Sequence, residues 1–78
     1  MTVLERMQQV IREVLDDDQL VLTDELTARD VEGWDSLGHI NIMFALESEF
    51  GVQFDDDQFS RLHDVGELRR FIEQATGD

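Results

Sequence analysis

The sequence predicts an all-α fold: a small four-helix bundle with three main helices, one short helix and a long first loop. Apolar residues recur at helical spacing in three segments, and an N-cap residue (Thr2, Asp35 or Asp64) precedes each segment. Leu, Ile, Val and Phe account for 25 of the 78 residues, enough for a modest packed core. The length indicates a single domain over residues 1–78.

The first helix is expected to start after Thr2, which forms a capping box with Glu5. It should end near Leu15, because the three acids 16–18 oppose the macrodipole at a helix C-terminus. Residues 16–34 then form a long connection that contains too many apolar residues for a free linker. We expect this connection to lie across the helices, anchored by its Leu and Trp side chains.

The second helix is predicted between its N-cap Asp35 and its stop signal Gly51. Placing its residues about 100° apart gives two apolar stripes and a polar strip. The stripe expected to face the core consists of Ile42, Met43, Leu46 and Phe50. The second stripe consists of Leu37, Ile40 and Phe44, and the polar strip of Gly38, Asn41, Ser48 and Glu49. Such an apolar helix is either buried on most sides or keeps one stripe for a partner.

In the C-terminal third, the sequence predicts a short extended segment over residues 52–54 and a brief helix that begins within residues 55–57. Asp64 and Glu67 then repeat the N-cap pattern before a final amphipathic helix. We expect Arg69 and Arg70 to lie towards its C-terminal half, where their positive charges would interact favourably with the helix dipole.

The net charge is −13, from 19 acidic residues and six arginines. This charge would repel phosphate backbones and anionic lipid, so we expect neither nucleic acid nor membrane as a partner. Between Glu13 and Ser60 the chain carries 14 acids and a single base, which favours steering towards basic partner surfaces. The chain has no Cys, no membrane-spanning apolar run and no signal-peptide pattern, so we expect a cytoplasmic protein.

No metal site and no catalytic activity are predicted. The acidic runs lack the Gly and Glu that a calcium-binding EF-hand loop requires. His39 and His63 have no partner at ligand spacing and are interpreted as surface or packing residues. Ser36 and His39 lack a third orienting group and an oxyanion hole, so a hydrolase is not indicated.

Ser36 has two interpretations. Serine commonly occurs at helix starts, so it can be a simple helix-favouring residue. However, Asp35 already supplies the cap, which leaves Ser36 available to point outwards. A helix N-terminus also attracts an anion, so an exposed hydroxyl there could carry a phosphodiester-linked group.

The sequence around Ser36 resembles the acyl carrier proteins. Asp35-Ser36-Leu37, preceded by Gly33-Trp34, resembles their D-S-L attachment motif, and residues 45–51 resemble the family's A-L-E-x-E-F-G segment. The resemblance covers essentially the whole chain. It implies an acyl-carrier-protein fold and a 4′-phosphopantetheine arm on Ser36, attached from coenzyme A by a phosphopantetheinyl transferase.

The resemblance also implies roles for the neighbouring residues. Asp35 would help to position the transfer near the transferase's magnesium ion, and Leu37 would adjoin the attached arm. The surface presented to acyl-loading and acyl-transfer enzymes with basic docking surfaces would comprise Leu37, Ile40, Asn41, Phe44, Glu47 and Asp56. The protein would be a monomer that shuttles acyl thioesters and catalyses nothing itself.

Two departures from the family pattern concern the pathway. Carriers of primary fatty-acid biosynthesis usually have acids early in the second helix, where this chain has Gly38, His39 and Asn41. A specialised pathway, such as polyketide-type biosynthesis, is therefore favoured. Peptidyl carriers usually show Gly-Gly-x-Ser, which this chain lacks. An aminoacyl or peptidyl carrier stays an alternative, as does an acidic helical interaction module without a prosthetic group.

Overall fold

The computed structural model describes residues 2–55 and 64–77. Within them it has the helices α1 (Val3–Leu15), α2 (Ser36–Phe50) and α4 (Val65–Thr76), and the short 3₁₀ helix η1 (Ala28–Asp30). The all-α prediction and its three main helices are confirmed, and the described residues form no strand beyond one isolated bridge between Thr27 and Asp64. The brief helix predicted after residue 55 lies outside the described residues.

The predicted helix caps are present. The backbone N–H of Glu5 donates to Thr2 Oγ1 at 3.1 Å, and Glu5 Oε1 accepts from the backbone N–H of Thr2 at 3.2 Å. Asp16 ends α1 in the left-handed conformation with φ 53°. At α4, Asp64 Oδ1 accepts from the backbone N–H of Glu67 at 2.8 Å. Local capping chemistry therefore sets the ends of these helices.

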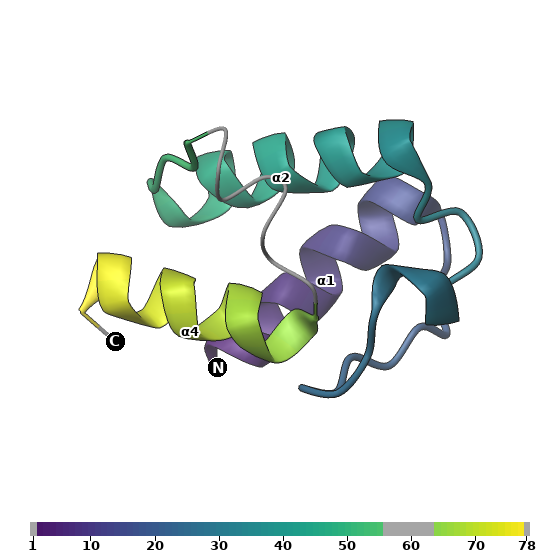
Figure 1. The fold of residues 1–78 in the computed structure, drawn as a ribbon, viewed down its shortest axis with the longest axis horizontal. Coiled ribbons are helices and arrows are strands. Elements are labelled where there is room, and N and C mark those ends of the chain that lie inside the picture. The colour runs from purple at the N-terminus through teal and green to yellow at the C-terminus, as the bar shows by residue number, and fades with distance from the viewer. Residues whose placement is uncertain (1, 56–63, 78) are drawn as a thin grey trace.

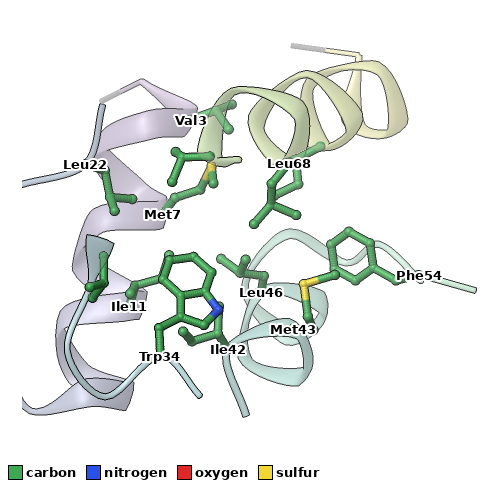
Figure 2. Packing of buried hydrophobic residues seen from close by; sticks show 13 residues of the cluster. Val3, Met7, Ile11, Leu22, Trp34, Ile42, Met43, Leu46, Phe54 and Leu68 are labelled. Carbon is green, nitrogen blue, oxygen red and sulfur yellow. The ribbon is translucent and has the colours of Figure 1, made fainter. Parts of the chain in front are cut away.

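Helix α1 packs against both α2 and α4, and runs obliquely from α4 towards α2 in Figure 1. Side chains from all three helices and from the connecting segments point towards one another in the core (Figure 2). The buried apolar residues are Val3, Met7, Ile11, Leu22, Val31, Trp34, Ile42, Met43, Leu46, Phe54, Val65, Leu68 and Ile72. The core stripe predicted on α2 is confirmed except at Phe50, which is only partly buried because it lies at the edge, under the Arg6 guanidinium.

The long first loop packs down onto α1, as predicted. Leu22 and Trp34 are buried in the core, and the loop backbone is bonded to polar side chains of α1. The N–H of Leu22 donates to Gln8 Oε1 at 2.9 Å, and Arg12 Nε donates to the carbonyl of Leu20 at 2.6 Å. Val21 is an exception among the loop's apolar residues, with 63% of its surface exposed.

The same loop is attached to the start of α4. The N–H groups of Val65 and Gly66 donate to the carbonyls of Leu26 and Asp24, both at 2.9 Å. Arg69 makes a two-pronged ion pair with Asp24, at 2.8 and 3.0 Å. The sequence-based role of Arg69 and Arg70 in the helix dipole is wrong, because α4 continues to Thr76 and its last turn has no basic residue. Arg69 instead joins α4 to the loop.

Candidate modification site at the start of helix α2

Ser36 is the first residue of α2, and its side chain is exposed. Asp35 provides the cap: its Oδ1 accepts from the backbone N–H of Gly38 at 2.8 Å. Among residues 2–55 and 64–77, no group forms a hydrogen bond with the Ser36 hydroxyl. Within the described residues, the hydroxyl is therefore exposed and makes no hydrogen bond.

The backbone around Ser36 offers a favourable setting for an attached phosphate. In the described part of the chain, the N–H groups of Ser36 and Leu37 have no hydrogen-bond acceptor, because they precede the first helical bond of α2, from His39 N–H to the Asp35 carbonyl. Unpaired N–H groups and the helix dipole both attract an anion. A phosphodiester on Ser36 therefore fits this helix start.

A tight backbone approach fixes the turn that enters α2. Gly33 has φ 90°, a conformation that favours glycine, and its carbonyl oxygen lies against Gly38. A Cβ atom on Gly38 would collide with that oxygen. Gly38 belongs to the predicted polar strip but is buried, because the Gly33 turn covers it.

A hydrogen bond between Trp34 and His39 also spans the site. Trp34 is 9% exposed, and its indole N–H donates to His39 Nδ1 at 3.0 Å. The two rings stack with an interplanar angle of 26°. The sequence-based interpretation of His39 as a surface or packing residue missed this bond. The available signal was the buried Trp, because a buried indole N–H requires an acceptor.

Most of the predicted partner surface shares one exposed side of α2 with Ser36. Leu37, Ile40 and Phe44 are 68%, 42% and 58% exposed, and Asn41 is exposed beside them. Glu47 lies further along, half-buried, and its Oε2 accepts from the backbone N–H of Phe54 at 2.8 Å. Asp56 lies outside the described residues.

The described residues offer neither a metal-binding cluster nor a membrane-spanning helix. Among them, no three His, Asp or Glu side chains are grouped so that they could hold a metal ion. No helix there combines the length and the apolar character needed to cross a bilayer.

The chain matches the family model described as the phosphopantetheine attachment site, over residues 5–72. It is 33% identical to an acyl carrier protein of Phenylobacterium zucineum, over 96% of this chain and 95% of that one. It is 32% identical to an acyl carrier protein of Thermotoga maritima, over 96% and 93% of the two chains. The solution structure of the holo acyl carrier protein from Geobacter metallireducens is also similar, with a TM-score of 0.91 and 34% identity over 99% of this chain and 88% of that one.

The family match and this helical scaffold define a carrier that bears a prosthetic group. The chain belongs to the acyl carrier protein family, and its cofactor is covalently attached 4′-phosphopantetheine.

Proposed function

We propose that Ser36 is the residue that carries the 4′-phosphopantetheine arm. The observation that carries this proposal is the exposed hydroxyl of Ser36, uncommitted among the described residues, at a helix start that Asp35 already caps. Ser48 is also exposed on α2, but it lies near the helix C-terminus, where the dipole disfavours an anion. Position on the helix therefore favours Ser36 over Ser48.

The protein's part in the proposed function is presentation and delivery. When attached, the arm supplies a thiol that holds an acyl group as a thioester. The turn made by Gly33, the Asp35 cap and the Trp34–His39 bond hold Ser36 outwards, where a phosphopantetheinyl transferase can reach it. Leu37, next to Ser36 and 68% exposed, would be the first side chain beside the arm. The chain itself catalyses no step in this proposal.

Asp35 is proposed to assist the loading step as well as capping the helix. It adjoins Ser36 and one of its carboxylate oxygens is bound to Gly38 N–H, which leaves the other to face the transferase and its metal ion. Asp35→Asn should keep the cap, because Asn caps helices well. We expect slower loading with an unchanged melting temperature; an unchanged loading rate would remove Asp35 from this role.

For the pathway, we propose a specialised fatty-acid- or polyketide-type biosynthesis in the cytoplasm. The support is the uncharged first half of α2, at Gly38, His39 and Asn41. An aminoacyl carrier is the second candidate. The holo protein is incubated separately with enzymes that activate amino acids and with enzymes that activate fatty or malonyl-type acids. The thioester that accumulates on the thiol shows which of the two carrier functions is correct.

The attachment proposal is tested by intact-mass spectrometry. The protein is incubated with coenzyme A and a broad-specificity phosphopantetheinyl transferase, as wild type, Ser36→Ala and Ser48→Ala. We expect one added phosphopantetheine and one new titratable thiol in the wild type and in Ser48→Ala, and neither in Ser36→Ala. An unmodified wild type would favour the interaction module without a prosthetic group.

A further inference from the structure

The first turn of α2 has few hydrogen bonds of its own. In the described part of the chain, the N–H groups of Ser36 and Leu37 have no acceptor. The N–H of Gly38 donates to the Asp35 carboxylate and that of His39 to the Asp35 carbonyl, both at 2.8 Å. The ends of helices open locally more readily than their interiors. A fixed position for Ser36 therefore requires contacts that reach beyond this turn.

The bond between Trp34 and His39 is such a contact. Trp34 is 9% exposed and belongs to the core cluster with Ile11 and Ile42 (Figure 2). Its indole N–H donates to His39 Nδ1 at 3.0 Å, and the two ring centroids lie 6.3 Å apart. The bond closes the chain around Ser36, from Trp34 before it to His39 after it. One buried ring thereby holds both sides of the modification site.

The other contacts of this turn have a different effect. The Asp35 cap and the approach of the Gly33 carbonyl to Gly38 join residues of the turn to one another. They set the shape of the turn, whereas the Trp34–His39 bond joins the turn to a core side chain and sets where it lies. Placement matters for group transfer, because a displacement of about 1 Å at the reacting atoms can cost about 100-fold in rate.

We propose that His39 is a positioning residue for attachment of the arm: through its bond to Trp34 it holds the Ser36 hydroxyl where the transferase acts on it. This inference rests on the proposed function, because it takes Ser36 as the attachment site. In the transfer, Ser36 Oγ bonds to the coenzyme A phosphorus nearest pantetheine, the pyrophosphate bond breaks, adenosine 3′,5′-bisphosphate leaves and the hydroxyl proton is released. His39 acts on this step through Trp34.

The loading kinetics of two His39 variants test the proposal, with coenzyme A and a broad-specificity transferase. His39→Leu removes the acceptor, and we expect kcat to fall at least about fivefold while KM for the carrier changes less than about twofold. The carrier still binds, but its hydroxyl is in place for less of the time. His39→Asn should restore at least about half of kcat, because Asn Oδ1, like His Nδ1, is an acceptor bonded to Cγ.

A double-variant cycle separates positioning from direct contact with the transferase. Trp34→Phe removes the donor but keeps an aromatic ring, and Trp34 is too buried to touch the transferase. We expect Trp34→Phe to lower kcat as His39→Leu does, and the double variant to be no slower than either single variant. A further fall in the double variant would overturn the proposal, because His39 would then act on the transferase directly.

Gln8→Leu is the matched control for a general loosening of the loop. Gln8 Oε1 accepts from the N–H of Leu22 at 2.9 Å, so this variant also removes an acceptor that holds the same loop. It should lower the melting temperature but keep kcat within about twofold of wild type. Equal losses of kcat in Gln8→Leu and His39→Leu would contradict a positioning role. All rates are measured where circular dichroism shows folded protein, and Trp34→Phe decides if His39→Leu does not fold.

Amide hydrogen exchange reports the position of the turn without the transferase. Gly38 N–H and Glu67 N–H are both bonded to a capping Asp, at the starts of α2 and α4. We expect His39→Leu to speed exchange at Gly38 relative to Glu67, because the first turn of α2 opens more often. An unchanged ratio of the two exchange rates would show that the bond does not hold this turn.

Failure of this inference is distinct from failure of the proposed function. If wild type acquires no arm, or acquires it elsewhere than on Ser36, the attachment proposal fails. If wild type is loaded at Ser36 while His39→Leu and Trp34→Phe keep the wild-type kcat, only the positioning proposal fails.

Discussion

The indole N–H of Trp34 donates to Nδ1 of His39 at 3.0 Å, across the residue that we propose to carry the arm. Trp34 ends the long loop and is 9% exposed in the core, whereas His39 belongs to the first turn of α2. An Nδ1 atom that accepts a hydrogen bond belongs to a neutral imidazole with its proton on Nε2. The bond therefore links the residues before and after Ser36 and anchors the start of α2 to the core.

Removing the acceptor should destabilise the fold measurably. His39→Leu leaves the indole N–H of Trp34 without this acceptor, and we expect the free energy of unfolding to fall by about 1–3 kcal/mol. His39→Gln offers an amide oxygen and should lose less. Trp34 is the only tryptophan, so its fluorescence reports urea unfolding directly. Equal stabilities for His39→Leu and wild type would show that the bond contributes nothing.

Gly38→Ala should destabilise the protein, although alanine normally favours a helix interior by up to about 1 kcal/mol. The added Cβ collides with the carbonyl of Gly33, so the turn before Ser36 must shift. We expect a net loss of about 1–3 kcal/mol, typical of overpacking, together with slower loading. Urea unfolding and the loading rate measure the two effects.

Gly51→Ala is the matched control for Gly38→Ala. Gly51 has φ 66°, and a Cβ there would meet no atom within 4 Å. Its cost is therefore backbone strain alone, about 1–2 kcal/mol, with no effect on loading. A Gly38→Ala protein that is more stable than wild type would contradict the close approach of Gly33.

The ion pair of Asp24 with Arg69 should make stability depend on pH. Hydrogen bonds from Arg69 hold the pKa of Asp24 below its ordinary value. A carboxyl with a depressed pKa in the folded state adds stability that is fully present above its unfolded pKa of about 3.9. That stability is lost as the pH falls through the lower, folded pKa.

We therefore expect Asp24→Asn to melt below wild type at pH 7 and the difference to shrink as the pH falls below about 4. Melting temperatures of both proteins from pH 7 to pH 2 test this. Glu5, whose pKa is lowered by its bonds to Thr2, is present in both and cancels in the comparison. A difference that stays constant over this range would mean that Asp24 contributes through packing rather than through its charge.

Truncations on the two stripes of α2 should have different costs. Ile42 is fully buried, so Ile42→Ala should lower the free energy of unfolding by about 2–5 kcal/mol. Phe44 is 58% exposed, so Phe44→Ala should cost less than about 1 kcal/mol while it impairs loading. Chemical denaturation of both variants measures the costs. A large loss in Phe44→Ala would assign Phe44 to the core.

Features set by neighbouring residues could be predicted from the sequence. The caps at Thr2, Asp35 and Asp64 follow from a side chain that bonds a backbone N–H three residues later. The core stripe centred on Ile42 and Leu46 follows from helical periodicity. The same capping argument predicted that Asp35 caps α2 and that Ser36 is therefore available to point outwards.

Features that depend on the path of the chain through space could not be predicted. The Glu47–Phe54 bond requires the backbone after α2 to fold back on the helix, and the Asp24–Arg69 pair joins residues 45 positions apart. Gly38 is buried because the turn at Gly33 places its carbonyl oxygen against the helix, and helical periodicity does not predict this contact.

Site-resolved fragmentation of the transferase-treated protein tests the central claim most directly, because the chain contains three serines, at positions 36, 48 and 60. The account predicts that the phosphopantetheine mass lies wholly on the peptide that contains Ser36 and that backbone fragments place it on that residue. Label on Ser48 or Ser60, or a wild-type protein that stays unlabelled at full transferase activity, would contradict it.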